Sequence, residues 1–269
     1  MDYATISEAL ASAGAGDTVF VDPGQYPENL SISRSVHLIA EGDSTAEIVA
    51  QERATPAVHV ESVREPCTVR GFKINGMYFA SAGIQAEESF VDILSNEIKA
   101  TTVGVFFRRS QGRIEDNLFR VNPGGALRLH GSSPLVVRNR FEDVAPMAIQ
   151  IVGKDSAPVI GGRDGSGNVF GAGYSTLVSN ETKNDIDARY NEWNWSATVE
   201  MKSQGYPSNI TAIYDQLDDA GLGTVDFRNW VEGESAGGPG GRMMWLIPVA
   251  VVVVLVWVLA SRRARGARA

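Results

Sequence analysis

The chain has 269 residues, 28 glycines, one cysteine and a formal net charge of −8. This acidic balance argues against a nucleic-acid partner, because proteins that bind nucleic acids neutralise phosphates with basic side chains. One cysteine excludes a disulfide framework. The sequence also lacks the Cys/His spacing of a metal site and the glycine pattern of a phosphate loop, so we expect no metal and no cofactor.

Residues 3–16 are predicted to form an N-terminal cap. Thr5-Ile6-Ser7-Glu8 matches a helix capping box, and the apolar residues that follow share one helical face: Ile6, Ala9, Leu10 and Ala13. A solenoid needs a cover over its first coil. No charged and apolar leader precedes this helix. Either the true start lies upstream of Met1, or the chain is trimmed, or the C-terminal tail inserts after translation, and we favour a missing or misassigned start.

Residues 17–193 are predicted to form the coils of a solenoid. Four segments align, with starts spaced 21, 22 and 22 residues apart: Gly83–Glu87, Gly104–Arg108, Ala126–His130 and Ala148–Val152. A second column runs in step through Ile93, Ile114, Val136 and Val159. A fixed period in the twenties is typical of solenoids, and apolar residues alternate within each segment, which indicates strands. The sequence therefore predicts a parallel β-helix whose coils stack at about 4.8 Å.

One corner of the coils is predicted to carry a ladder of side-chain amides. The expected members are Asn96, Asn117, Asn139, Asn168 and Asn191. Asparagine tolerates the left-handed turn conformation, and stacked amides can hydrogen-bond along the stack. The longer step from Asn139 to Asn168 predicts a projecting loop near residues 163–167.

The outward positions of the aligned strands predict a polar surface. One column holds Gln85, Phe106, Arg128 and Gln150, the candidate ligand-binding residues, and the next holds Glu87, Arg108 and His130, the candidate catalytic residues. Stacked strands place such neighbours about 5 Å apart. The surface can be a solvated sheet face with an ordinary Glu–Arg pair, a carbohydrate-binding face with an aromatic for stacking, or a catalytic site in which Glu87 and His130 serve as acid and base.

Two further residue types are expected to be structural. Cys67 lies in an apolar run near Val69 and is expected in the core rather than as a reactive thiol. His37 and His59 alternate with apolar neighbours and are expected to point outward without a special role.

The C-terminal part contains a closing segment and a membrane anchor. Residues 206–231 are expected to close the β-helix, with Ile210, Ile213, Tyr214 and Leu217 at helical spacing. Residues 232–242 form a Gly-rich linker, and residues 243–260 are long and apolar enough to span a membrane. Arginines in the tail, residues 261–269, predict a cytoplasmic C-terminus and a β-helix outside. A buried helix, or a sorting signal that is cut and replaced by another anchor, is the alternative.

Residues 3–231 resemble a known fold family. Two strings are similar to pectin-lyase-like proteins, which include pectinesterases and NosD-type periplasmic proteins. They are G-D-T-V-F-V-D-P-G-Q-Y-P-E-N at residues 16–29 and the closing Thr224-Val225-Asp226-Phe227. The resemblance implies an all-β, right-handed, single-stranded parallel β-helix. It does not bring the paired aspartates of polygalacturonases, the calcium carboxylates of pectate lyases or a copper tract.

The sequence favours a single-pass, membrane-anchored module outside the cytoplasm. We expect residues 1–231 to bind carbohydrate or cell-envelope components, or to serve a structural role, rather than to catalyse. The alternative is a polysaccharide lyase, hydrolase or epimerase acting on the outer face of the β-helix.

Overall fold

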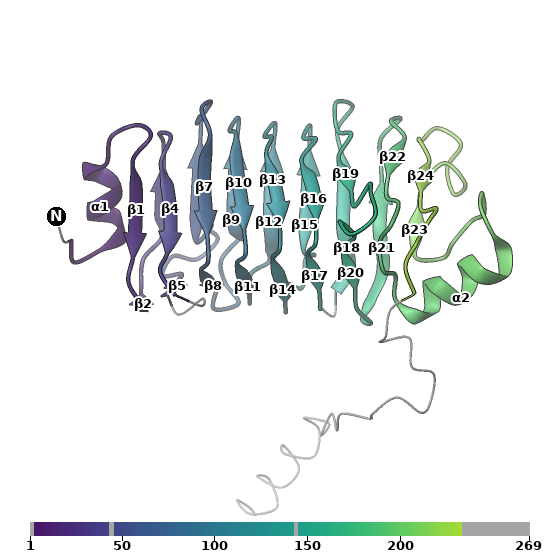
Figure 1. Ribbon diagram of the computed structural model, residues 1–269, viewed down its shortest axis with the longest axis horizontal. Helices are drawn as coiled ribbons and strands as arrows, with labels where there is room; N and C mark the ends of the chain where they lie inside the picture. Colours follow the sequence, from purple (N-terminus) through teal and green to yellow (C-terminus); the bar gives the residue numbers. More distant parts are fainter. Residues whose placement is uncertain (1–2, 43–45, 143–144, 233–269) are drawn as a thin grey trace, which may run out of the picture. The chain divides into compact units, whose positions relative to one another are not determined.

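The computed structural model describes residues 3–42, 46–142 and 145–232, and these form a parallel β-solenoid (Figure 1). Most coils supply a strand to each of three sheets, and the paired strands run parallel. The predicted all-β parallel β-helix is therefore confirmed. Most of the predicted linker, the predicted span at 243–260 and the basic tail lie outside the described residues. Within the described residues, no helix has the length and apolar character needed to cross a membrane.

Three sheets run along the solenoid. Sheet A contains, in spatial order, β1 (Thr18–Val21), β4 (His37–Ala40), β7 (Cys67–Arg70), β10 (Val91–Leu94), β13 (Arg113–Glu115), β16 (Leu135–Val137), β19 (Val159–Ile160), β22 (Ile186–Asp187) and β24 (Val225–Asp226). Sheet B contains β2 (Gly24–Tyr26), β5 (Ala46–Val49), β8 (Lys73–Asn75), β11 (Glu97–Lys99), β14 (Leu118–Arg120), β17 (Arg140–Phe141) and β20 (Val169–Phe170). Sheet C contains β3 (Leu30–Ile32), β6 (Val58–Glu61), β9 (Ala82–Glu87), β12 (Val103–Arg108), β15 (Leu127–His130), β18 (Ala145–Val152), β21 (Tyr174–Asn180) and β23 (Ile213–Tyr214).

The register of sheet C agrees with the sequence repeat. Val105 pairs with Ile84 on one side and with Leu127 on the other, and Leu127 pairs with Ile149. The predicted column in sheet A is correct through Val136 but wrong at its last member. Val136 pairs with Ile160, which is fully buried, whereas Val159 is 37% exposed. Because side chains alternate along a strand, a slip of one residue turns the position to the opposite face.

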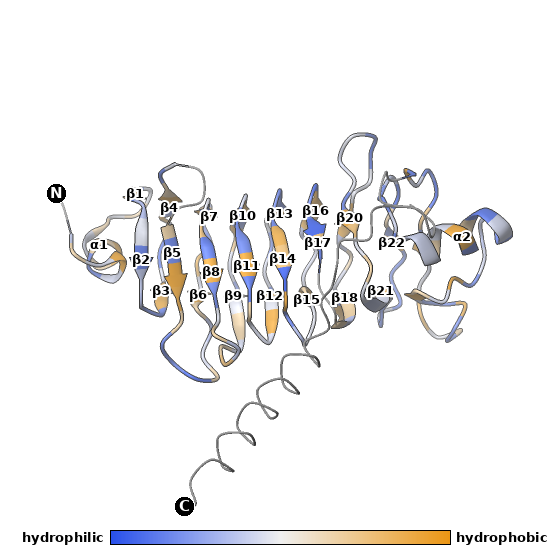
Figure 2. Cartoon of the chain, turned by 90° about the horizontal axis from the view of Figure 1, so that it is seen from below, coloured by the Kyte–Doolittle hydropathy of each residue, from blue (hydrophilic) through white to orange (hydrophobic). Residues whose placement is uncertain are grey.

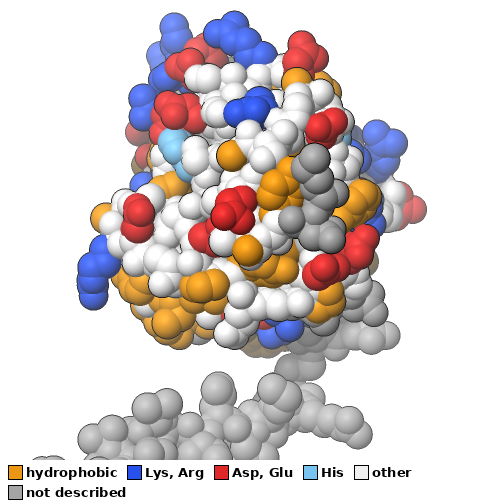
Figure 3. All heavy atoms as spheres, turned by 90° about the vertical axis from the view of Figure 1, so that its left-hand side faces the viewer, with side chains coloured by type: hydrophobic (Ala, Val, Ile, Leu, Met, Phe, Trp, Pro, Cys, Tyr) orange, Lys and Arg blue, Asp and Glu red, His pale blue; other side chains and the backbone are white. Residues whose placement is uncertain are grey.

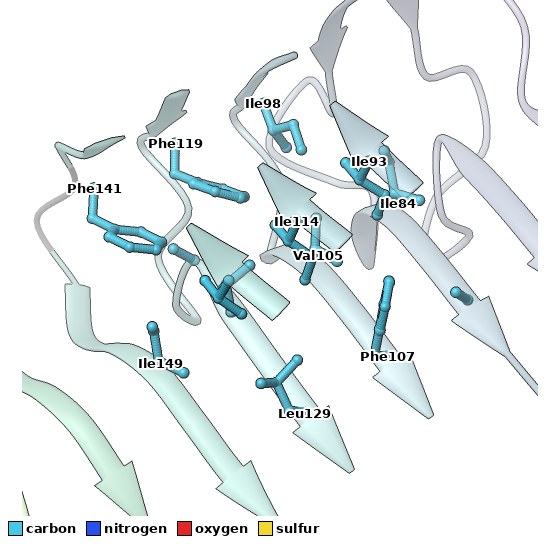
Figure 4. Close-up of a cluster of buried hydrophobic side chains, with 14 of the residues drawn as sticks. Ile84, Ile93, Ile98, Val105, Phe107, Ile114, Phe119, Leu129, Phe141 and Ile149 are labelled. Carbon is cyan, nitrogen blue, oxygen red and sulfur yellow. The ribbon is translucent and has the colours of Figure 1, made fainter. Parts of the chain in front are cut away.

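The inward side chains of the three sheets form one continuous core. Figure 4 shows Ile84, Val105, Leu129 and Ile149 on successive strands, pointing into the same interior as Phe119 and Phe141. Aromatic rings continue this stacking from coil to coil: Phe119, Phe141, Phe170 and Trp193 have successive centroid distances of 5.2, 4.9 and 4.8 Å. Each coil therefore buries its apolar residues against its neighbours, as a solenoid requires.

The asparagines at the corner between sheets A and B form a hydrogen-bonded chain. The Nδ2 group of Asn96 donates to Oδ1 of Asn117 at 3.1 Å, and the same bond recurs from Asn117 to Asn139, from Asn139 to Asn168 and from Asn168 to Asn191 at 2.9–3.0 Å. Each Oδ1 also accepts the backbone N–H of the preceding asparagine. These buried amides are thereby satisfied, which a buried polar group requires.

The left-handed turn at this corner falls one residue earlier than the sequence suggested. Ser95, Asp116, Arg138 and Tyr190 have φ between 53° and 65°, and each directly precedes a ladder asparagine. The asparagine is selected because its amide reaches inward to two coils, and not because it adopts the left-handed conformation.

A second ladder lies at the corner after sheet C. Ser89, Ser110, Ser132 and Ser156 are buried, and the backbone N–H of each of the first three donates to Oγ of the next at 3.0–3.1 Å. Their spacing of 21, 22 and 24 residues was visible in the sequence. Hydroxyls thus satisfy this corner as amides satisfy the other.

Helix α1 (Ile6–Ser12) begins as the capping box predicts. Thr5 accepts a hydrogen bond from the Glu8 backbone, and Glu8 accepts one from Thr5. The Glu28 carboxylate, from the loop before β3, accepts the backbone N–H groups of Ile6 and Ser7. The acidic residue in the Gly24–Asn29 string therefore holds the helix N-terminus onto the solenoid. Figure 3 views this end of the molecule, where hydrophobic side chains gather on part of the surface; that α1 acts as an end cap stays a prediction.

The C-terminal end differs from the sequence expectation. Helix α2 (Trp195–Gln204) was not predicted, although Asn194 caps its first turn and Gly205 ends it. The residues with helical spacing at 208–221 form no helix: Ile213 and Tyr214 lie in β23, and turns follow. The Asp215 carboxylate accepts backbone N–H groups of Leu217 and Val225, and these bonds stabilise turns in place of a helix.

Candidate functional site: the outer face of sheet C

The candidate residues lie in two rows across neighbouring strands of sheet C. In one row Phe106 of β12 is the register partner of Gln85 and Arg128, and Arg128 is the partner of Gln150. In the other row Arg108 is the partner of Glu87 and His130. Since Ile84, Val105, Leu127 and Ile149 point inward, the alternation of the strands places both rows on the outer face. The structure therefore brings the seven predicted residues together on one surface.

Glu87 is the most enclosed carboxylate of this surface. Gln85 Nε2 donates to Glu87 Oε1 at 2.6 Å, and Arg108 Nη1 lies 3.5 Å from Glu87 Oε2. The Glu87 side chain is only 19% exposed. A carboxylate held by an amide and a guanidinium is fixed in position and remains available as an acceptor at its remaining lone pairs.

Two residues continue the surface toward the C-terminus. Arg128 Nε donates to Gln150 Oε1 at 2.9 Å, and Gln150 Nε2 donates to Glu181 Oε1 at 2.8 Å. Ser179 Oγ, on the register partner of Gln150, donates to the same Glu181 oxygen at 3.2 Å. Ser179 and Glu181 were missed because the loop after β19 interrupts the 22-residue period, so the alignment could not be extended to β21.

The centre of the surface carries basic side chains. Arg128 and His130 are exposed, whereas Phe106 and Arg108 are half-buried. A Cβ placed on Gly153 would come within 2.7 Å of His130 Cδ2, so the imidazole lies against this glycine. Among the described residues, no carboxylate lies within ion-pair distance of Arg128 or His130. Apart from Arg128 Nε, which donates to Gln150, the donors of these two side chains therefore remain available to solvent or to a ligand.

His59 is a further member that sequence reasoning set aside. It is the register partner of Gln85, and its Nε2 atom lies 4.0 Å from Glu87 Oε1. That nitrogen is buried and has no hydrogen-bond partner in the structure. The sequence contained a signal for this placement, because one more step back along the Gln85 column reaches His59. The step is longer than the others: Val58 precedes Ile84 by 26 residues and not by 21 or 22. The longer corner at residues 76–81 hid the alignment.

Outward charges on sheets A and B are arranged differently. On sheet A, Arg113 pairs with Asp92 at 2.7 Å, and Arg138 pairs with Asp116 at 2.9 Å and also with Glu115. The hydrogen bonds that the guanidiniums donate to Asp92 and Asp116 raise the pKa of Arg113 and of Arg138. These charges are satisfied by one another.

Sheet B shows the same pairing. Glu142 accepts from Arg120 and from Arg140, each at 2.9 Å. Burial raises the pKa of Glu142, but the hydrogen bonds from the two arginines outweigh burial and leave the pKa below its ordinary value. This carboxylate is therefore held in its charged form by the sheet itself.

The described residues offer no metal centre. They contain no group of three or more His, Cys, Asp or Glu side chains arranged to hold a metal ion. Cys67 is 1% exposed, as expected for the core, and burial raises the pKa of its thiol to about 11.

A separate hollow of about 550 Å³ lies between α1 and β1 at the N-terminal end. Its lining includes Asp17, Asp22, Tyr26 and Phe20, and the Phe20 side chain is 63% exposed. None of the candidate residues of sheet C lines this hollow, so it is a different feature from the sheet C face.

Comparison with known proteins gives no assignment of activity. No family model matches the sequence, and no curated protein matches it. Among solved structures, the alginate lyase from Paenibacillus sp. str. FPU-7 matches with a TM-score of 0.40 and 17% sequence identity, over 70% of this chain and 72% of that chain. The resemblance to NosD-type proteins therefore stays a prediction, and the function has to be argued from the surface of this chain.

Proposed function

We propose that this protein is a membrane-anchored module outside the cytoplasm that binds carbohydrate, or another cell-envelope component, on the outer face of sheet C. The observation that carries the proposal is the contrast within one molecule between paired and unpaired cations. Arg113, Arg138 and Arg120 are bound by carboxylates of their own sheets. Arg128 is bound only to the neutral Gln150 amide among the described residues, and Phe106 lies beside it in register.

This arrangement suits a sugar chain for a chemical reason. Carbohydrate hydroxyls are donors and acceptors at once, and the face offers both guanidinium donors and carboxylate acceptors. The Phe106 ring provides an apolar surface against which a sugar ring can pack. Because the side chains repeat at the strand spacing, the contacts extend along the solenoid over β6, β9, β12, β15 and β18.

Membrane anchoring is the second element of the proposal. It rests on the apolar stretch at 243–260, which has the length of a membrane span, and on the arginines that follow it. The positive-inside rule would place the solenoid outside. Flotation of the full chain with vesicles, against a chain ending after residue 242, tests this element by itself.

A polysaccharide-processing enzyme is the second candidate function. The observation that favours it is Glu87, which lies between Arg108 and the unsatisfied Nε2 of His59. A carboxylate and an imidazole at this separation can together act as general acid and general base, so that a proton passes between them and a bound sugar. Arg108 would then stabilise negative charge on the substrate.

One screen separates the two functions. Full-length protein is incubated with a panel of neutral and acidic polysaccharides, and both retention on immobilised glycan and the release of reducing or unsaturated ends are recorded. Retention without product supports the binding module. Product release that disappears in Glu87→Gln supports the enzyme. A result with neither retention nor product release would contradict both functions and would leave a structural role.

A further inference from the structure

The outer face of helix α2 carries an unpartnered apolar stripe. Trp195 and Val199 are 53% and 44% exposed, and they are four residues apart, with Lys202 three residues further on. Side chains at this spacing lie on one face of a helix. The opposite face is occupied by Ala197, Thr198 and Met201, which are buried in the solenoid end. Figure 2 shows α2 at the C-terminal end of the solenoid, with hydrophobic residues along part of it.

This face carries almost no charge, in contrast to the rest of an acidic protein. The exposed residues of α2 are Trp195, Ser196, Val199, Lys202, Ser203 and Gln204. The one acidic residue of the helix, Glu200, is turned away and accepts the backbone N–H of Thr211 at 2.7 Å. Lys202 forms an ion pair with Glu232 at 2.9 Å. The exposed helix face therefore contains an indole, an aliphatic side chain and one neutralised lysine.

The face also lies where the chain leaves the solenoid. Glu232 is the last described residue, and its ion pair with Lys202 places the end of the described chain beside α2. Lys202 Nζ also lies 5.8 Å from the centre of the Trp230 ring, and Val231 is 45% exposed. Only residues 233–242 separate this point from the proposed span, and ten residues reach at most about 36 Å.

We infer that the Trp195–Val199–Lys202 face of α2 rests on the lipid surface next to the anchor. Indole side chains are favoured at the headgroup level of a bilayer. A lysine can extend its charged end into water while its stem lies on apolar material. The inference rests on the proposed anchoring, because a tether of this length keeps the face close to the bilayer, so that a weak affinity of the face for lipid is sufficient. Its consequence is a defined orientation of the solenoid on the membrane.

A single engineered thiol tests the inference. Cys67 is the sole cysteine and is buried, so Val199→Cys introduces one reactive site in the full chain. Val121→Cys is the matched control, because Val121 is 51% exposed and follows β14, away from α2. Each variant is labelled with an environment-sensitive fluorophore and reconstituted in phosphatidylcholine vesicles, with or without a lipid carrying a nitroxide in the upper acyl chain.

The expected result is several-fold stronger nitroxide quenching at position 199 than at position 121, together with a blue shift only at position 199. Equal, weak quenching at both positions in protein that floats with the vesicles would overturn the inference and leave the anchor intact. A blue shift at position 199 that nitroxide lipid does not quench would assign the face to the chain's own residues 233–242 or to a second copy, which also overturns it. Protein that does not float would refute the anchor, and the inference with it.

Discussion

The outer faces of the three sheets share one construction but differ in how their charges are satisfied. On sheets A and B, several arginines pair with carboxylates of neighbouring coils, as Arg113 does with Asp92 and Arg120 with Glu142, although Arg70 of β7 forms no ion pair with the described residues. On sheet C, Gln85, Phe106, Arg128 and Gln150 share one row, and in the next row Arg108 pairs with Glu87. A ladder of paired charges has little hydrogen-bonding capacity left, whereas an unpaired row retains it for a ligand. The faces therefore differ in side-chain pairing and not in strand geometry.

The largest effect is expected from Arg128→Ala. Loss of a hydrogen bond from a charged donor costs about 1.5–3 kcal/mol, so affinity for the retained glycan should fall about 10- to 100-fold. Isothermal titration of the variant against the polysaccharide identified in the screen measures this. Arg120→Ala, on sheet B, is the control and should bind as the parent protein does. Equal losses in both variants would contradict the distinction between the faces.

A smaller effect is expected when a paired carboxylate of sheet A is neutralised. Asp226 accepts hydrogen bonds from Arg228 at 2.7 and 2.9 Å, and these lower the pKa of Asp226 below its ordinary value. The stabilisation is therefore complete above the ordinary carboxyl pKa of about 4 and disappears as the pH falls through the lower, folded-state pKa. Asp226→Asn should reduce the free energy of unfolding by about 1 kcal/mol at pH 7.

Urea unfolding at pH 7 and at decreasing pH checks this pH dependence. The difference between parent and Asp226→Asn should shrink as the pH falls below about 4. Asp219→Asn serves as a matched control, because Asp219 has no arginine partner among the described residues. A difference that stays constant down to pH 2 would show that Asp226 acts by packing and not by its charge.

A paired charge can also be introduced into sheet C. Val152 is the register partner of His130 and is half-buried. Val152→Glu would place a carboxylate beside His130 and near Arg128, and an ion pair with Arg128 worth about 0.5–1 kcal/mol should weaken glycan binding about two- to fivefold. Val152→Gln has the same shape without the charge. The comparison between the two faces requires Glu to weaken binding more than Gln does, and the reverse order would contradict it.

The smallest effect is expected from Arg138→Ala. Arg138 pairs with Asp116 and Glu115, but its side chain is 43% exposed, and exposed ion pairs contribute about 0–1 kcal/mol. The melting temperature should fall only slightly and less so at high salt, while glycan binding should not change. A loss of binding would mean that sheet A also contacts the ligand.

Much of the fold was predictable because the structural repeat of a solenoid appears as a repeat of residue types in its sequence. The columns through Ile84 and through Asn96 repeat at nearly constant spacing, and each inward position accepts only apolar or ladder-forming residues. Prediction failed where the period changed length. The last member of the sheet A column was placed at Val159 and not at Ile160, and His59 was not connected to Gln85, because the intervening corners differ in length.

The ends of the solenoid were less predictable for another reason. Helix α2 contains Ser196, Thr198 and Val199, which are weak helix formers, and its stability comes from burying Met201 and Ala197 in a partner surface. Such tertiary contacts leave no local pattern. The polar surface of sheet C was predicted as a set of neighbours, but its decisive property, the absence of a carboxylate beside Arg128, depends on side-chain contacts that a sequence does not state.

The asparagine ladder gives the interior of this protein a direction. Between side chains, the Nδ2 groups of Asn96, Asn117, Asn139 and Asn168 each donate to Oδ1 of the ladder asparagine in the next coil. Each of these Nδ2 groups also donates to a backbone carbonyl of the preceding coil. Aligned amide dipoles in a water-free environment polarise one another, so each bond strengthens those on either side. The strength of each hydrogen bond in the row therefore depends on the others. Asn117→Ala and Asn168→Ala should therefore not be independent of each other in their effect on stability, although the coil of Asn139 lies between the two sites.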